Sequence, residues 1–304
     1  MGLLPGGHTS AAYGLNQAGV VVGNADTGNG STPGFKFSGD AISSIGPLTA
    51  GASTHAYSVN AGDDVTGETL VGKYEQAYFY SHGVMHDLGT LGGHSSFAYA
   101  INDSQTIVGG SYIRGDAVVH AFVWTPAAGM KDLGTLGGGF SLAYAITAAG
   151  KIVGYSTNSR GQNHAFLYDG KMHDMGTLAG ASRTIAYAIN AAGSIVGSAT
   201  IGKNEHAFLY TGGKFADLGT LGGAASYAYG INRSGTIIGT STIKGSSTTH
   251  AFEYRGGKMY DLNQEIDPKS GWTLLAASAV NDAGQIVGLG IFHGQTHGFI
   301  LTPV

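Results

Sequence analysis

The chain alternates short apolar runs with glycine-rich turns along its whole length. One such run is Ala186-Tyr187-Ala188-Ile189-Asn190, in which an extended backbone puts tyrosine and isoleucine on one face and the alanines on the other. It is followed by Ala191-Ala192-Gly193, and Asn and Gly supply the left-handed positions that a tight hairpin needs. No stretch has a helical spacing, and no apolar run approaches the ~18 residues of a membrane span. The pattern predicts an all-β protein of many short strands.

Four sequence signatures recur in a fixed order about every 42 to 45 residues. The most regular is Asp87-Leu88-Gly89-Thr90-Leu91-Gly92-Gly93, which returns at Asp132, Asp174 and Asp217 and in part at Asp261. An Ala-Tyr-x-Ile-Asn run, an Ile-Val-Gly run and a His-Ala-Phe run are the other three. The third-strand histidines are His120, His164, His206 and His250, with His297 in a His-Gly-Phe variant. Seven copies are present.

Each copy contains four short strands, which is typical of one blade of a β-propeller. We therefore predict a single domain over residues 1–304, folded as a seven-bladed β-propeller of four-stranded antiparallel blades. The seventh copy stops at a third strand, in the run from His297 to Val304. We expect the N-terminal stub Leu4-Pro5-Gly6-Gly7, which matches the end of Thr90-Leu91-Gly92-Gly93, to close the ring by pairing in the last blade.

The amino-acid composition argues against some classes of function but does not identify the function. Charged residues make up 11% of the chain and the net charge is −4 with 15 Lys+Arg, so we expect no nucleic-acid partner. The absence of cysteine excludes disulfides and Cys-based zinc sites, and we expect no cofactor. The segment Met1–Gly6 lacks the basic and apolar regions of a signal peptide. We expect a monomer.

These signatures resemble those of the HAF-repeat family, a group of bacterial proteins described as extracellular repeat proteins. The resemblance covers nearly the whole chain. It rests on the His-Ala-Phe runs at His120, His164, His206 and His250 and on the Asp-Leu-Gly-Thr-Leu-Gly-Gly runs at Asp87, Asp132 and Asp217. The resemblance implies a secreted or cell-envelope setting, and it brings no defined activity and no agreed catalytic residues. The first two copies depart from the family pattern.

The repeated histidines and tyrosines have structural interpretations that we prefer. Each His-Ala-Phe histidine is followed within ~10–12 residues by the aspartate of the fourth strand, and adjacent antiparallel strands would pair the two, so we predict a structural His–Asp pair in a buried polar network. The repeated tyrosines could form a stacking platform for sugars, but we expect them in the core between blades. They are Tyr13, Tyr57, Tyr99, Tyr144, Tyr187 and Tyr229.

Loop residues that differ between copies are the better functional candidates, because the fold does not require them. The loops that lead into the innermost strands carry His8, His55, His94, Phe140, Arg183 and Trp272. The loops between second and third strands carry Tyr112, Arg114, Arg160 and Lys203, together with Asp26, Glu68, Lys73, Tyr74, Glu75, Asp116, Glu205 and Lys244. We expect both sets around one funnel.

These loop residues fit two functions that require a binding or catalytic site, and a third possible function requires none. The first is a binding module that recognises a carbohydrate or small ligand through Tyr112, Arg114, Arg160, Lys203, Trp272 and Phe140. The alternative is a polysaccharide lyase, in which His94, His8, His55 or a tyrosine abstracts the proton next to a uronate carboxylate and Arg183 or a lysine stabilises the charge. The third is a purely structural adhesive domain.

Metal sites are weakly indicated. The run Asn24-Ala25-Asp26-Thr27-Gly28-Asn29-Gly30 has some features of a calcium loop but carries Phe35 at its twelfth position, so whether it binds calcium is left open. His82 and His86 share one face of a strand without a third ligand nearby. We predict no metal site.

Overall fold

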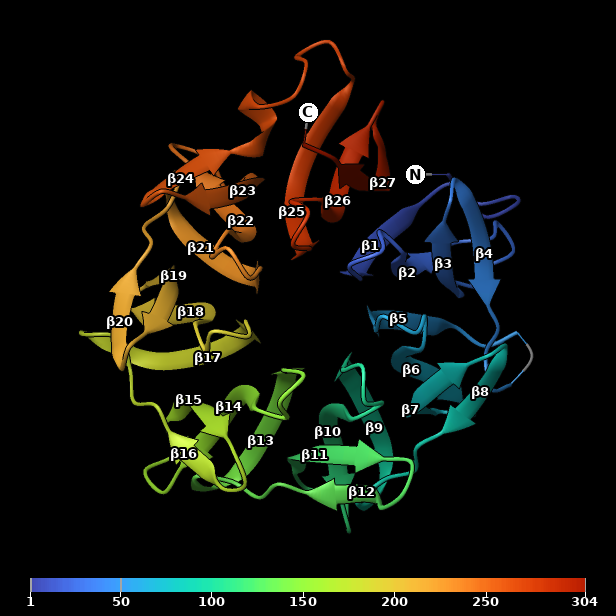
Figure 1. The fold of residues 1–304 in the computed structure, drawn as a ribbon, viewed down its shortest axis with the longest axis vertical. Coiled ribbons are helices and arrows are strands. Elements are labelled where there is room, and N and C mark those ends of the chain that lie inside the picture. Colours follow the sequence, from blue (N-terminus) through green and yellow to red (C-terminus); the bar gives the residue numbers. More distant parts are fainter. Residues whose placement is uncertain (1, 50, 304) are drawn as a thin grey trace.

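The computed structural model describes residues 2–49 and 51–303, and its strands form antiparallel sheets arranged around a central axis (Figure 1). The first sheet contains β1 (Ser10–Leu15), β2 (Val21–Ala25), β3 (Gly34–Ser38) and β4 (Ala41–Ile45). The second contains β5 (Thr54–Val59), β6 (Val65–Val71), β7 (Tyr74–Ser81) and β8 (Val84–Asp87). In both sheets the strands lie side by side in chain order.

The next two sheets repeat this arrangement. One contains β9 (Gly92–Ile101), β10 (Ile107–Ile113), β11 (Val119–Thr125) and β12 (Gly129–Asp132). The other contains β13 (Gly137–Ile146), β14 (Ile152–Asn158), β15 (Asn163–Tyr168) and β16 (Met172–Asp174). The first strand of each sheet lies innermost and the fourth lies at the rim (Figure 1).

An eight-stranded sheet follows, made of two antiparallel sets of four. It contains β17 (Ala181–Ile189), β18 (Ile195–Ile201), β19 (Asn204–Thr211), β20 (Lys214–Asp217), β21 (Gly222–Ile231), β22 (Ile237–Ile243), β23 (Thr249–Arg255) and β24 (Lys258–Asp261). A single parallel bridge, between Glu205 and Ala225, joins the two sets. The 3-10 helix η1 (Leu262–Gln264) then leads to a three-stranded sheet of β25 (Trp272–Val280), β26 (Ile286–Phe292) and β27 (Gln295–Leu301). The predicted all-β architecture of four-stranded antiparallel sheets is confirmed for four of the six sheets; the exceptions are the eight-stranded sheet and this last sheet.

Apolar residues from neighbouring sheets interlock to form the core. Between the second and third sheets, Leu88 packs with Ala98, Ile107 and Phe122, which are at most 6% exposed. Burying a leucine or phenylalanine side chain stabilises the fold by about 1.5–3 kcal/mol. Because each sheet is too thin to hide both faces alone, the repeats must stack on one another to be stable.

Asparagines at the turns after the innermost strands link one sheet to the next. The Oδ1 atom of Asn16 accepts from the N–H groups of Ala18 and Val20, while its Nδ2 donates to the carbonyl of Asn60, 3.0 Å away. Equivalent hydrogen bonds to the neighbouring sheet start at Asn60, Asn102, Asn190, Asn232 and Asn281. The bond from Asn281 reaches back to the carbonyl of Asn16 in the first sheet. The asparagines do not supply the left-handed position that we expected of them, because glycines such as Gly193 (φ 84°) do. Asparagine instead caps the turn and binds the neighbouring sheet.

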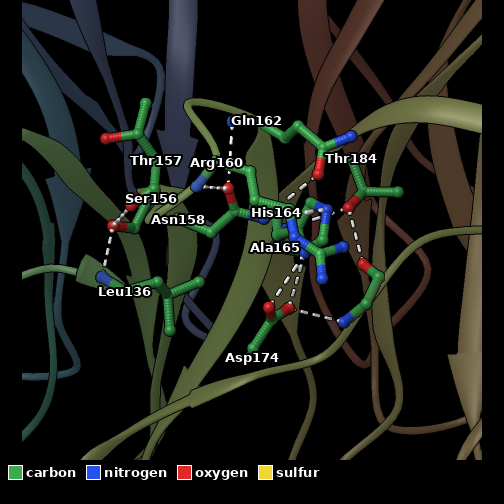
Figure 2. Close-up of polar contacts among 11 residues, drawn as sticks. Leu136, Ser156, Thr157, Asn158, Arg160, Gln162, His164, Ala165, Asp174 and Thr184 are labelled. Atoms are coloured by element: carbon green, nitrogen blue, oxygen red, sulfur yellow. Dashed lines mark hydrogen bonds and ion pairs between the residues drawn. The ribbon is translucent and has the colours of Figure 1, made fainter. Parts of the chain in front are cut away.

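A second repeated hydrogen bond closes the ring. The backbone N–H of Ala165 in β15 donates to the Thr184 hydroxyl of the next sheet, 3.0 Å away (Figure 2). Between the last and first sheets, the N–H of Gly298 donates in the same way to Ser10 at 3.0 Å. Adjacent sheets therefore contact each other around the whole ring, including the junction between the two ends of the chain.

The N-terminal stub does not pair in the last sheet, so that part of the fold prediction is wrong. The run Leu4-Pro5-Gly6-Gly7 forms a turn, in which the Gly7 N–H donates to the Leu4 carbonyl at 2.9 Å. Proline has no N–H to donate to a strand partner, and Gly6 adopts a positive φ of 78°. Leu4 is instead buried against Ala12 and Val287, between the first and last sheets. The last sheet therefore keeps three strands within the described residues.

Among the residues that the structure describes, no helix is both long and apolar enough to cross a membrane.

Candidate functional site

Six tyrosines from consecutive innermost strands pack in a row of aromatic side chains, which we call the tyrosine ring; the seventh innermost strand has Ser278 at this position, so the row is open between Tyr229 and Tyr13. Its members are Tyr13, Tyr57, Tyr99, Tyr144, Tyr187 and Tyr229, and neighbouring ring centroids lie 5.2–5.7 Å apart. Each tyrosine is the unpaired residue of a β-bulge, as Tyr144 is between Ala143 and Ala145. A bulge re-aims its extra side chain, so these rings meet one another beside the axis. They pack between neighbouring sheets, as expected, but they remain partly exposed instead of being fully buried.

The tyrosine hydroxyls are weak acids in this setting. Burial raises the pKa of all six phenols above the ordinary value of 10. Protonated phenols donate hydrogen bonds and do not accept protons at neutral pH. The tyrosine ring can therefore stack against a ligand and donate to it, but it is a poor source of a general base.

On the second sheet, a histidine, a tyrosine and a glutamate converge. His55 in β5 lies directly opposite Glu68 in β6, and its Nδ1 is 3.2 Å from the Glu68 Oε1. The Tyr57 hydroxyl donates to the same oxygen at 2.9 Å and lies 3.2 Å from His55 Nδ1. Glu68 is thus held by two side chains at the edge of the tyrosine ring.

Arg183 and Glu205 flank the tyrosine ring on another sheet. Both are in register with Thr200, which pairs with Arg183 on one side and Glu205 on the other. The Nε atom of Arg183 and the Oε2 atom of Glu205 are buried, and neither has a hydrogen-bond partner among the described residues. Arg183 lies near Tyr144, Tyr155 and Tyr187, whose ionised forms it favours electrostatically. Buried polar atoms in proteins normally have a hydrogen-bond partner, so these two atoms distinguish this part of the tyrosine ring from the rest.

Two hollows lie on the surface of the second and third repeats and meet at Glu75. The first, the His55 hollow, has a volume of about 120 Å³ and is lined by Ser53, His55, Glu68, Thr69, Leu70 and Glu75. The second, the His94 hollow, has a volume of about 300 Å³ and is lined by Tyr74, Glu75, His94, Ser95, Phe97, Tyr112 and Asp116. Together they bring three carboxylates and three aromatic rings to one surface.

His94 lines its hollow and makes two side-chain contacts there. Its imidazole stacks on Tyr74 with ring centroids 4.6 Å apart and planes 14° from parallel. Its Nδ1 contacts the Asp116 carboxylate, which also accepts the His94 backbone N–H at 2.7 Å. These bonds hold the pKa of Asp116 below its ordinary value. Tyr112 packs on Phe97 on the other side of the hollow, with ring centroids 6.5 Å apart.

The structure brings together only some of the predicted site residues. His55, His94 and Tyr112 line the joined hollows, and Arg183 lies at the tyrosine ring. Phe140 packs on Tyr155, at a ring-centroid distance of 5.4 Å. Trp272 instead packs on Phe292 in the last sheet and lines a different hollow. The exposed members are His8, Arg114, Arg160 and Lys203.

Sequence reasoning passed over Phe97 and Tyr155. Tyr155 follows an Ile-Val-Gly run, at a position where other copies have Gly110, Ser198 or Thr240. The remaining copies have Asn24, Glu68 and Leu289 there, so the available signal was a position that varies between copies and carries an aromatic residue only at Tyr155. Phe97 carried no such signal, because large apolar residues recur at its position.

The predicted His–Asp pairs are confirmed in four repeats. In Figure 2, the His164 Nδ1 faces the Asp174 carboxylate, and the two are 2.8 Å apart. The equivalent pairs are His120–Asp132, His206–Asp217 and His250–Asp261, at 2.7–2.8 Å. The carboxylates also accept a backbone N–H of the following turn, as Asp174 does from Gly176. Three of the four aspartates are about 40% exposed, so the pairs are less buried than we expected.

No group of three or more possible metal-ligating side chains occurs within residues 2–49 and 51–303. In the run that has features of a calcium loop, the Asp26 carboxylate already accepts hydrogen bonds from His8, Thr9 and Gly28. These bonds lower the pKa of Asp26 and tie the N-terminal segment to the end of β2.

No protein-family model and no curated protein sequence matches the chain. Among solved structures, the β-propeller domain of the Trilobed protease from Pyrococcus furiosus, for which an open velcro topology is reported, is 10% identical, with a TM-score of 0.62 over 98% of this chain and 94% of that one. A puromycin-hydrolysing peptidase from Mycobacterium tuberculosis is 12% identical, with a TM-score of 0.61 over 93% of this chain. The match covers 49% of the peptidase, about half its length. At such low identity the likeness shows the fold alone, which is a β-propeller.

Proposed function

We propose that the chain is one domain, a seven-bladed β-propeller of the HAF-repeat type. The seven sequence copies support this count, as does the single bridge between the two halves of the eight-stranded sheet, which we count as two blades. Links from Asn281 and Gly298 back to the first sheet support closure of the ring. The secreted or envelope setting is part of the same proposal and rests on the family resemblance.

The proposed function is binding of a neutral carbohydrate or similar small polar ligand at the joined hollows. The observation that carries it is the meeting of aromatic rings and carboxylates at Glu75. Tyr112 offers a face for the apolar side of a sugar ring, while Glu68 and Glu75 can accept hydrogen bonds from its hydroxyls. A few placed polar groups in an aromatic cleft are typical of small-ligand sites. Three carboxylates favour a neutral ligand over an acidic one.

Titration of the protein with a panel of neutral oligosaccharides, followed by calorimetry, tests this function. We expect saturable binding that weakens about tenfold or more in Tyr112→Ala and in Glu75→Gln, which corresponds to about 1.4 kcal/mol each. Lys203→Ala, on an exposed turn away from the hollows, is the matched control. Binding of no sugar in the panel, or binding that both hollow variants leave unchanged, would contradict the proposal.

The lyase alternative receives less support from the geometry. The raised pKa values of the tyrosine ring argue against a tyrosine base. Arg183 lies near Tyr144 and Tyr187, whereas His94 is bonded to Asp116, so the proposed base and charge stabiliser have different neighbours. Incubation with uronic-acid polymers, monitored at the absorbance band of the unsaturated product, distinguishes a lyase from a binding module. Turnover that is lost in His94→Ala would replace binding with catalysis.

A further inference from the structure

Two glutamates of the second sheet lie on one face of neighbouring strands. Glu68 in β6 lies opposite Ala77 in β7, and Glu75 of β7 lies opposite Leu70 of β6. Because side chains alternate along a strand, Glu68 and Glu75 point to the same side of the sheet as diagonal neighbours. Both line the His55 hollow. The fold therefore brings two carboxyl groups to one small concave surface.

The register of the two glutamates suits the hydrolysis of a glycosidic bond. Diagonal neighbours on an antiparallel strand pair have Cβ atoms about 7–8 Å apart or slightly less, and side chains that leave one face together keep a similar separation. Glycosidases that invert the anomeric centre hold their two carboxyl groups about 6.5–9.5 Å apart, which leaves room for a water molecule, whereas retaining enzymes need about 5–5.5 Å. The positions of Glu68 and Glu75 therefore fit the inverting arrangement.

Glu68 is oriented by two side chains of its own sheet. The Tyr57 hydroxyl donates to Glu68 Oε1 at 2.9 Å, and the His55 Nδ1 lies 3.2 Å from the same oxygen. Burial raises the pKa of Tyr57, so its hydroxyl stays protonated and acts on Glu68 as a donor. Both contacts are made to Oε1, so Oε2 is the oxygen that can take a proton from a water molecule in the hollow.

Glu75 lies where the His55 hollow and the His94 hollow meet. An oligosaccharide that places one sugar in each hollow has its linking oxygen at this junction. The third carboxylate, Asp116, is less suited to donate a proton there, because its bonds with His94 hold its pKa below the ordinary value and keep it ionised at neutral pH. Glu75 is therefore the carboxyl group that is placed to protonate the linking oxygen.

We propose that the joined hollows hydrolyse O-glycosidic bonds between neutral sugars with inversion at the anomeric carbon, an inference that rests on the ligand class proposed above. Glu68 removes a proton from water, and the water oxygen forms a bond to the anomeric carbon. The bond from that carbon to the linking oxygen breaks, its electron pair stays on the oxygen, and Glu75 supplies the proton. One water molecule is consumed, and the two carboxyl groups then restore their protonation states by exchange with solvent. Tyr112 offers its ring to the leaving sugar in the His94 hollow.

Incubation of the protein with the same panel of neutral oligosaccharides, followed by chromatography of the products, tests the proposal. We expect hydrolysis whose rate constant falls at least a hundredfold in Glu68→Gln and in Glu75→Gln, since a general acid or base contributes about 10²–10⁴-fold. The calorimetric affinity of the same variants should fall only about tenfold. Glu265→Gln, at an exposed glutamate outside both hollows, is the matched control and should hydrolyse at the wild-type rate.

A substrate whose leaving group needs no proton distinguishes the roles of the two glutamates. On a dinitrophenyl glycoside of the sugar that is hydrolysed, Glu75→Gln should keep most of the wild-type rate, whereas Glu68→Gln should still lose at least a hundredfold. The activity that Glu75→Gln keeps also shows that this variant is folded. Proton NMR of the first product should show the inverted anomer.

The outcomes separate this inference from the binding function. Oligosaccharides that bind in calorimetry and are not hydrolysed would overturn the hydrolase and leave the binding function standing, whereas binding of no sugar would overturn both. Product with retained anomeric configuration would overturn the role of Glu68 as the base for water. An equal loss on the dinitrophenyl glycoside in both variants, each still able to bind sugar, would overturn the role of Glu75 as the acid.

Discussion

The regular sheets, from β9 to β24, and the second sheet, β5 to β8, share one architecture but use their polar residues differently. In the regular sheets each third-strand histidine is bonded to a fourth-strand aspartate, as His206 is to Asp217. The second sheet has Gln76 at the histidine position, and its Nε2 donates to the His94 carbonyl of the next sheet. His55 and Glu68 of the same sheet face a hollow instead. In the second sheet the histidine of the pair is thus replaced by a glutamine that bonds the next sheet, while His55 and Glu68, at other positions, line a hollow that a ligand can reach.

What both kinds of sheet keep unchanged is the glycine of the Ile-Val-Gly run. A Cβ atom built on Gly154 would lie 1.9 Å from the carbonyl oxygen of Leu142 in the paired inner strand, and one on Gly67 would lie 1.8 Å from that of His55. No side-chain movement can relieve a clash with backbone. This glycine therefore belongs to the architecture, whatever a given sheet does with its polar residues.

The largest expected effect comes from removing that shared feature. Gly154→Ala should lower the free energy of unfolding by about 3 kcal/mol or more, because the inner strand must shift. Gly139→Ala is the matched control in the same sheet, since its Cβ would be 3.6 Å from Val118 Cγ1, an ordinary contact. Urea unfolding followed by circular dichroism measures both. Similar losses in the two variants would show that close strand approach at Gly154 does not govern stability.

A smaller effect tests the pair that only the regular sheets have. His206→Gln should cost about 1 kcal/mol, because the pair is partly exposed and its net hydrogen-bond contribution is modest. Asp217→Ala should cost more, since Asp217 also accepts the Gly219 N–H at 2.8 Å. A double-mutant cycle in urea isolates the pairwise coupling. Zero coupling would mean that the histidine and aspartate act separately. The second sheet would then not differ from the regular sheets by the lack of a stabilising His–Asp pair.

The features that recur in every copy could be predicted from the sequence. The four signatures predicted the strands. The spacing of His164 and Asp174 predicted a side-chain pair, and the two neighbouring strands do bring these residues together. Alternation failed for Tyr144, because a β-bulge interrupts the period of two and turns the ring toward its neighbours. The prediction that Leu4–Gly7 pairs in the last sheet failed because it rested on sequence similarity to Thr90–Gly93 and ignored that Pro5 and Gly6 favour a turn. The hollows escaped prediction since Glu75 and Phe97 come from different sheets.

The smallest effect concerns a buried acid that only the second sheet carries. Asp64 is 4% exposed, and burial opposes its ionisation, but hydrogen bonds from Ser81, Gln105 and Asn60 outweigh that cost and hold its pKa below the ordinary value. A lowered folded-state pKa means that the stabilisation is complete above about pH 4 and is lost as the pH falls through the folded pKa. Asp64→Asn should therefore be less stable than the wild type at pH 7, and the difference should shrink as the pH falls below about 4.

Urea unfolding of both proteins between pH 2.5 and 7 measures this difference, and the exposed Asp40→Asn serves as the control for general acid effects. The regular sheets have no aspartate at this turn position, where Ser194 and Thr236 stand instead. The part of the acid sensitivity that Asp64 contributes should consequently disappear in Asp64→Asn while the His–Asp pairs are left intact. If Asp64→Asn tracks the wild type in parallel over the whole range, the Asp64 carboxylate does not contribute to the pH dependence.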